Sequence, residues 1–362
     1  MLTTTAALRS GSAEPITKPE NPPGGWDTTY TFKTSYGFKD NVLFRPQLPV
    51  ASSFAMISAD VILWRPPEPL WDLMFITSAE YTRYIPGSEV TGETTAFSQF
   101  QVKRDLGQKW RFSLSLQYLF FDQVLDNSDL DQLFSTLQLQ GHSLSIQPSL
   151  RREAPNGMFV EAGYTITRQH YQSVVDDEWQ LGPRFSIGKS YGNRSEFSLG
   201  LQFLQRRFDD RQPRSADGLS TIQDSLKYQQ LETSLVWNHH WDGQRRWRTS
   251  TRLGFLRNND NYSGYYDYDR FRLTEQLRYR SRGFQFRAEL KLSQYEYALQ
   301  HAGPSDPAQR RRTMSYASIR AEKNLREHLM VFTEYSHERS LSNLRSDSYQ
   351  ANTISAGIEL EF

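Results

Sequence analysis

Basic side chains recur at alternate positions between residues 248 and 291. Charges of one sign, clustered in a confined channel, attract ions of the opposite sign. The pattern therefore predicts a selectivity wall for anions or acidic sugars. The residues that would form it are Arg248, Arg252, Arg272, Arg278, Arg280, Arg287 and Lys291.

Acidic side chains occupy comparable alternate positions toward the two ends of the sequence. If both sets face one interior, a basic wall lies beside an acidic arc. Two other interpretations stay open: the charges pair across strands only to satisfy one another, or they form a docking surface for a plug or a partner. The acidic residues are Asp60, Glu80, Glu322, Glu334, Glu359 and Glu361.

The elements that position these charges are β-strands. Residues 354–362 place an apolar side chain at every second position and end in the aromatic Phe362, with polar residues between. A period of two means that successive side chains point to opposite faces of a sheet, and a helix would scramble both faces. The same alternation recurs along residues 27–362 and predicts an all-β, antiparallel, up-and-down transmembrane barrel of about 16 strands. Counts of 14 or 18 are the alternatives.

Composition supports this architecture and excludes several others. The chain has 362 residues, of which 37% are hydrophobic and 14% aromatic, and no stretch approaches the ~20 apolar residues that a membrane helix needs. The formal net charge is only +1. A nucleic-acid binder typically carries a large excess of basic residues on one face, so this class of protein is not indicated. The absence of cysteine excludes thiolate metal sites and cysteine nucleophiles.

The chain divides into two parts. Residues 1–26 are rich in Pro, Gly, Ser and Thr, which predicts a flexible periplasmic leader or linker, and residues 27–362 form the barrel. Connections between the predicted strands alternate short and long, with long ones at 39–51, 123–134, 209–224 and 298–312. An even strand count places both termini on the periplasmic, short-turn side. Pro148 and Pro183 fall inside predicted strands and argue against them.

Aromatic residues gather near the predicted strand ends, where amphipathic rings would mark two membrane interfaces. A competing interpretation is that aromatics favour any sheet. The tyrosines between 262 and 268 belong to the same pattern, with stacking on sugar rings as an alternative role. The tryptophans concerned are Trp71, Trp110, Trp179, Trp237, Trp241 and Trp247.

Through its terminal Phe362, its last strand and its repeated alternation, the chain resembles the Gram-negative outer-membrane β-barrel proteins, including porins. Residues 36–43 also look like a stretch in the barrels of exopolysaccharide-export and surface-lipoprotein systems. The resemblance implies an outer-membrane location, contact with membrane lipid, and recognition of the C-terminal strand by the barrel-assembly machinery through Phe362. We also expect a periplasmic partner. We do not expect the protein to bind nucleic acid.

Enzymatic function is not predicted, and neither a metal nor a cofactor is expected. His142 and Ser143 are adjacent and face opposite sides, so the Ser/His pattern of barrel phospholipases fails. Asp209 and Asp210 at an outer loop, and His170 and His337 near strand ends, are expected to lie on strands that are far apart. The predicted function is an outer-membrane channel for hydrophilic solutes, among them anionic solutes or saccharides. The alternatives are a structural or assembly barrel that docks a partner, and a soluble two-sheet sandwich.

Overall fold

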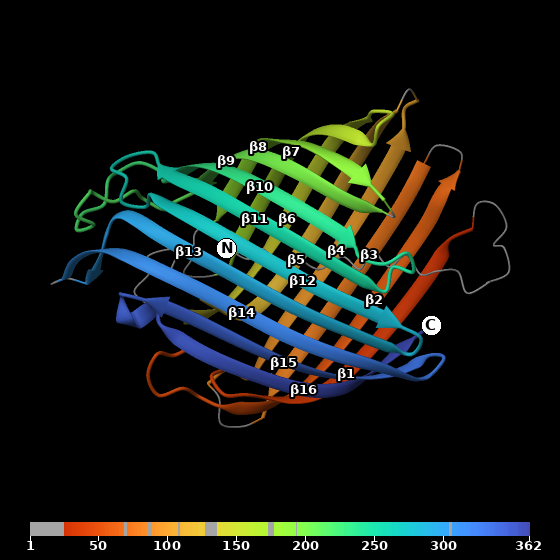
Figure 1. The fold of residues 1–362 in the computed structure, drawn as a ribbon. Helices are drawn as coiled ribbons and strands as arrows, with labels where there is room; N and C mark the ends of the chain where they lie inside the picture. Colours follow the sequence, from red (N-terminus) through yellow and green to blue (C-terminus); the bar gives the residue numbers. More distant parts are fainter. Residues whose placement is uncertain are drawn as a thin grey trace.

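The computed structural model describes residues 25–68, 71–85, 89–107, 109–126, 136–172, 177–192, 194–303 and 306–362. Their strands form one closed antiparallel barrel of 16 strands, drawn in Figure 1. The predicted fold class and strand count are confirmed. The predicted leader at 1–26 and the predicted long connection at 123–134 lie largely outside the described residues.

The strands follow one another around the barrel in sequence order, and a short 3-10 helix, η2 (Arg345–Asp347), precedes the last of them. No helix in the described part of the chain is long and apolar enough to cross a membrane. The strands are β1 (Asp27–Lys39), β2 (Ser52–Glu68), β3 (Trp71–Tyr84), β4 (Gly92–Asp105), β5 (Trp110–Asp126), β6 (Thr136–Glu153), β7 (Met158–Tyr171), β8 (Glu178–Tyr191), β9 (Ser195–Phe208), β10 (Lys227–His240), β11 (Trp247–Asp260), β12 (Tyr268–Ser281), β13 (Phe284–Gly303), β14 (Asp306–Arg326), β15 (Leu329–Ser342) and β16 (Tyr349–Glu361).

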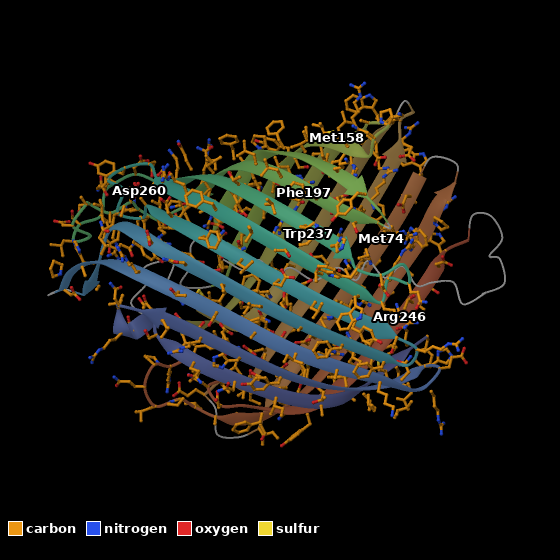
Figure 2. The ribbon with its side chains drawn as sticks, viewed as in Figure 1. Met74, Met158, Phe197, Trp237, Arg246 and Asp260 are labelled. Atoms are coloured by element: carbon orange, nitrogen blue, oxygen red, sulfur yellow. The ribbon has the colours of Figure 1, made fainter. Side chains whose placement is uncertain are left out.

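Alternation along β9 shows how the sequence builds the wall. Phe197, Leu199 and Phe203 are exposed on the outer face, with 42%, 46% and 47% of their surface accessible. Small and polar residues between them face the interior. Phe197 lies directly opposite Trp237 on β10, and Figure 2 shows both on the near wall. The outside of the barrel is therefore apolar, and the inside is polar.

The barrel closes where its first and last strands meet. β1 pairs antiparallel with β16, from Thr31 opposite Glu361 to Lys39 opposite Thr353. The backbone N–H of Tyr30 donates to the Phe362 carbonyl at 3.0 Å, and the N–H of Phe362 donates to the Tyr30 carbonyl at 2.9 Å. Phe362 thus completes the ladder that removes both sheet edges.

The two ends of the barrel differ in their connections. Tight turns such as 282–283 and 327–328 lie at one end, together with the start of β1 and the end of β16. The longer connections 40–51, 209–226 and 343–348 lie at the other end, on the left of Figure 1. We call these the short-turn end and the long-loop end.

The two strand prolines do not end their strands. Pro148 lies opposite Leu114, and Pro183 lies opposite Tyr164. On the other side of each proline the ladder is interrupted, because β6–β7 pairing skips from Ile146 to Ser149 and β8–β9 pairing skips from Leu181 to Arg184. A missing N–H is tolerated when pairing is lost on one side only.

The prediction of a long connection at 298–312 is wrong. β13 continues to Gly303 and β14 begins at Asp306, so most of this segment is paired strand, with register shifts near His301. Side chains hold the extension together: Arg310 donates to Gln300 at 2.6 Å, and Gln309 donates to the Ala298 carbonyl at 3.1 Å. Because its residues are mostly polar, the segment carries no apolar alternation to reveal the strands.

Candidate functional site: the arginine row inside the barrel

The interior face is identified by side chains that meet across the barrel. Glu80 on β3 and Glu334 on β15 line one cavity of about 310 Å³ together with Lys33 on β1. Three strands separate β3 from β15, so these side chains can meet only through the interior. Direct partners in an antiparallel ladder share a face, and the register therefore assigns every strand position to the inside or the outside.

Four arginines form a continuous row on the inside. Arg248 lies opposite Arg278, Arg278 opposite Arg287, and Arg287 opposite Arg320, on β11 through β14. We call this set the arginine row. Like charges directly opposite on neighbouring strands destabilise a sheet, so the row opposes folding unless anions or carboxylates lie close by. Beyond Arg320 the row ends at Glu334.

Two members of the row donate to neutral acceptors. Arg248 contacts the Asn238 side-chain oxygen at 3.5 Å, and Arg278 donates to the Gln285 oxygen at 3.3 Å. Hydrogen bonds to amide oxygens orient a guanidinium group without cancelling its charge.

Arg320 differs, because three of the predicted acidic residues converge on it. Its Nε, Nη1 and Nη2 atoms contact carboxylate oxygens of Glu322, Glu334 and Glu359 at 2.6, 3.1 and 3.2 Å. The Glu359 side chain is 0% exposed and that of Glu322 is 3% exposed. The acidic arc is thus tied to the basic wall at this point.

The remaining acidic residues lie on β2, β3 and β16. Asp60 contacts the Lys33 ammonium at 2.7 Å and accepts from Ser78 at 2.5 Å. Glu80 lines the cavity already described. Glu361 is exposed, near the short-turn end.

The other predicted basic residues share the interior face with the arginine row. Lys291 lies 3.2 Å from a Glu289 oxygen and 4.8 Å from the centre of the Tyr316 ring. Arg252, Arg272 and Arg280 surround the row by register, and Arg280 is exposed at the end of β12. The selectivity role of all these residues stays a prediction.

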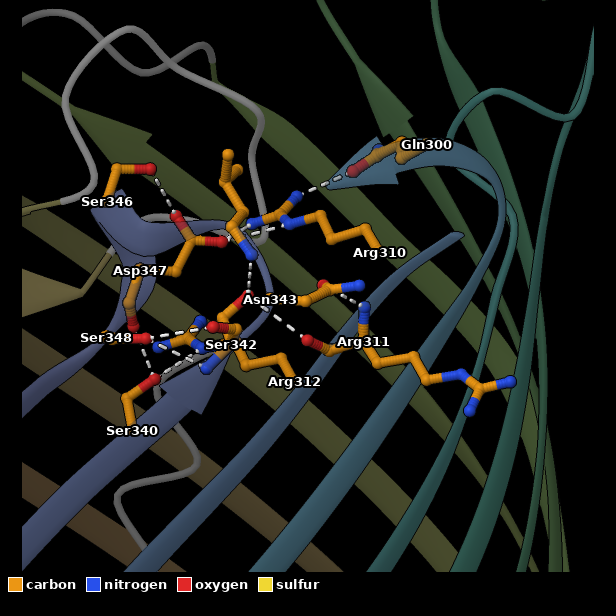
Figure 3. Close-up of polar contacts among 11 residues, drawn as sticks. Gln300, Arg310, Arg311, Arg312, Ser340, Ser342, Asn343, Ser346, Asp347 and Ser348 are labelled. Atoms are coloured by element: carbon orange, nitrogen blue, oxygen red, sulfur yellow. Dashed lines mark hydrogen bonds and ion pairs between the residues drawn. The ribbon is translucent and has the colours of Figure 1, made fainter. Parts of the chain in front are cut away.

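Sequence reasoning missed the cations that neutralise the acidic arc, Arg320 and Lys33. Both sit at interior positions of their strands, so alternation alone could have found them. It also missed two buried ion pairs at the long-loop end, Arg206–Glu178 and Arg310–Asp347, each at 2.6 Å. Figure 3 shows Arg310 reaching Asp347 and Gln300.

Loops narrow the long-loop end from within. Val42 and Phe44, in the connection 40–51, pack against interior residues that include Tyr84 and Tyr349. In the opposite wall, Leu226 packs with Phe208, Tyr228 and Tyr266.

This packing corrects the interpretation of the tyrosines between 262 and 268. Tyr266 and Tyr268 are 4% and 8% exposed and belong to interior clusters, so neither belongs to an interfacial belt. Their burial also leaves no open ring face for a sugar. Tyr262, at 61% exposed, is accessible.

The prediction that His170 and Asp209 lie far apart is wrong. His170 Nδ1 lies 2.5 Å from Asp177, and Arg168 bonds both Asp177 and Asp209, so His170 and Asp209 share one network at the long-loop end. His337 lies elsewhere, bonded to Asn352 at 2.8 Å. Among the described residues, no group of three or more His, Cys, Asp or Glu side chains is arranged to hold a metal ion.

Neither a protein-family model nor a curated protein matches this chain. Solved structures that resemble it include OccAB1 of Acinetobacter baumannii, with 9% identity over 93% of this chain and 97% of that one, at a TM-score of 0.48. An anion-selective porin from Comamonas acidovorans is 10% identical over 94% and 100% of the two chains, with a TM-score of 0.48. OmpT, an outer membrane protein of Vibrio cholerae, is 13% identical over 94% and 100%, with a TM-score of 0.47.

Proposed function

We propose that the protein is an outer-membrane channel whose interior attracts anionic hydrophilic solutes. The outer wall supports the membrane location, because large apolar side chains such as Ile57, Phe185 and Ile354 are exposed along it. A continuous exposed apolar surface is unstable in water and stable in hydrocarbon. Trp71 and Trp247 lie outward at strand ends, where amphipathic rings favour a membrane interface.

The size of the barrel supports a channel. Barrels of 16 to 18 strands leave an aqueous passage, whereas about eight strands are filled by side chains. The interior of this barrel is lined by charged and polar groups rather than by a dry apolar core. Water and small hydrophilic solutes are the natural contents of such an interior.

The arginine row is the observation that carries the anion preference. The guanidinium groups of Arg248, Arg278 and Arg287 on three neighbouring strands concentrate positive potential along one wall, whereas carboxylates surround Arg320 at the end of the row. An anion beside the row relieves repulsion between the arginines, whereas a cation adds to it. The free energy of transfer therefore favours anions on this path.

Orientation follows from the connections. With an even number of strands, both ends of the barrel sequence lie at the short-turn end, which faces the periplasm in outer-membrane barrels. β16 and its terminal Phe362 then form the segment that the barrel-assembly machinery recognises. A periplasmic partner would meet this same end.

Single-channel recording in planar bilayers tests the proposal. Under a salt gradient, the reversal potential should indicate preference for chloride over potassium. Arg278→Gln combined with Arg287→Gln should lower that preference, because two adjacent charges of the row are removed.

Two controls separate charge from packing. Arg278→Lys with Arg287→Lys keeps both charges and should keep most of the preference. Arg257→Gln changes an outward-facing arginine bonded to Asp269, so it should leave the reversal potential unchanged. A folded barrel that does not conduct, or a reversal potential identical in the Gln variant, would overturn the proposal.

A further inference from the structure

A second row of side chains crosses the outer face at the long-loop end. Arg168 on β7 lies opposite Trp179 on β8, Trp179 opposite Arg207 on β9, and Arg207 opposite Lys227 on β10. We call this set the rim row. Its residues face outward, on the side of the wall that carries the exposed apolar groups.

The two ends of the rim row differ in how their charges are balanced. Arg168 bonds Asp209 at 3.0 and 2.6 Å and Asp177 at 3.1 Å, so carboxylates neutralise it. Arg207 instead donates only to the neutral Gln205 oxygen, at 3.2 and 2.9 Å. Within the described residues, no carboxylate forms an ion pair with Arg207 or Lys227.

Arg207 and Lys227 therefore repel each other. Directly opposite side chains have Cβ atoms about 4.5–5.5 Å apart, and like charges in this position destabilise the pair of strands. A neighbouring outward arginine shows the usual solution: Arg257 forms two bonds to Asp269, at 2.9 and 3.0 Å. The Arg207–Lys227 pair has the geometry to share one anion between a guanidinium and an ammonium group.

Trp179 indicates what kind of anion is within reach. Its ring is 42% exposed on the outer face, and the Arg168 guanidinium carbon lies 5.3 Å from its centre. Tryptophan on the outside of a membrane barrel marks the depth of the lipid headgroups. Arg207 is the direct cross-strand partner of Trp179 and Lys227 is the next residue along the row, so both lie within two strand spacings of this ring.

We propose that Arg207 and Lys227 form a binding site for the phosphomonoester headgroup of a lipid in the leaflet at the long-loop end. This inference rests on the proposed membrane location and is independent of conduction. A phosphomonoester offers three acceptor oxygens and close to two negative charges, which suits a guanidinium and an ammonium group a few ångströms apart.

Native mass spectrometry of the folded protein in detergent tests the site. The probes are phosphatidic acid and phosphatidylcholine with the same acyl chains, since only the former carries a phosphomonoester. Wild type should retain phosphatidic acid in preference to phosphatidylcholine. Arg207→Gln with Lys227→Gln should weaken phosphatidic acid binding roughly 30-fold, as expected for two basic residues at a lipid surface.

Arg257→Gln is the matched control, because this outward arginine is already neutralised and its loss should leave lipid retention unchanged. Lys227→Gln alone provides a milder variant if the double variant does not fold, and it should show a partial loss. Inorganic phosphate added in excess should not displace the lipid, whereas displacement would mean that a free phosphate ion is the ligand. Equal retention by wild type and either Gln variant would overturn the site.

Failure of the site is distinguishable from failure of the channel proposal. Conductance of the double variant should match wild type, because neither residue faces the interior. A conducting barrel without headgroup preference would overturn only the lipid site, and a lipid-binding barrel without conductance would overturn only the channel.

Discussion

Arg320 on β14 and Glu359 on β16 are joined at 3.2 Å, across the width of the intervening strand β15. Through Glu322 and Glu334, the same guanidinium group also ties together β14 and β15. Because β16 closes the barrel onto β1, this contact links the basic wall to the closing strand. The charged interior is thus part of how the cylinder is held together.

Arg320→Gln should destabilise the barrel by about 3 kcal/mol, since removing one partner leaves buried carboxylates without a counter-charge. Guanidinium-induced unfolding in detergent micelles or lipid vesicles, followed by the heat-dependent mobility shift on gels, measures the loss. Arg326→Gln, at the exposed end of the same strand, should unfold at the wild-type midpoint. Equal midpoints for both variants would mean that the carboxylates are not held by Arg320.

Alternation was sufficient to predict which face each strand residue occupies, because a period of two depends only on neighbouring residues. It could not predict the arginine row. Whether Arg248 stands opposite Arg278, or one position away, depends on how each turn sets the register between strands. Composition of the strands alone does not determine that register.

The long-loop end was predicted least well, for a different reason. Alternation says nothing about a loop that folds inward, so burial of Val42 and of Tyr266 could not be anticipated. The extension of β13 and β14 was missed because its strands are joined by polar contacts such as Arg310–Gln300 and Gln309–Ala298, which leave no apolar alternation in the sequence.

Asp347→Asn should loosen the connection at 343–348. The substitution removes the counter-charge of Arg310, whose side chain is 4% exposed, while that of Asp347 is 3% exposed. Hydrogen exchange of the Asp347 and Ser348 amides, which donate to Leu344 and Arg345, should become faster. Arg345→Gln, an exposed neighbour in η2, should leave both rates unchanged. Unchanged exchange in Asp347→Asn would show that backbone bonds alone order the connection.

The network around Asp177 should produce a defined pH dependence. Burial raises the pKa of the Asp177 carboxyl, but hydrogen bonds from His170 and the Tyr171 backbone, with the charges of His170 and Arg168, outweigh burial and hold the pKa below its ordinary value of 3.8. A carboxyl with a lowered folded-state pKa binds fewer protons when folded, so its stabilising contribution is complete above 3.8 and is lost as pH falls through the folded pKa.

Asp177→Asn should therefore be less stable than wild type at neutral pH, and the difference should shrink as the solution is acidified below the ordinary carboxyl pKa. Denaturant midpoints of the two proteins across an acid pH series measure this difference. Asp306→Asn, an exposed carboxyl on β14, should show no such pH-dependent gap. A gap that persists unchanged to the most acid point would mean that the Asp177 carboxylate is not the stabilising group.

Glu275 is a charged residue midway along the outer face of β12, and its replacement should stabilise the barrel. It lies on β12 between the outward-facing Leu273 and Leu277, with Thr251 and Leu290 as its direct partners. Its carboxylate accepts from the Thr251 hydroxyl at 2.5 Å. Cationic residues on the lipid face near the midplane cost about 2–4 kcal/mol, and carboxylates cost less. Glu275→Leu should raise the unfolding free energy in lipid vesicles by up to about 2 kcal/mol.

The matched control for that change is Glu289→Leu on the neighbouring strand. Glu289 faces the interior, accepts from Gln276 at 2.8 Å and contacts Lys291 at 3.2 Å, so its loss should lower stability. Opposite signs for the two substitutions would separate the lipid face from the aqueous face within a single hairpin. If Glu275→Leu instead lowered stability in pure lipid, the outer wall at β12 would have to be in contact with water, and the membrane-spanning arrangement would be wrong.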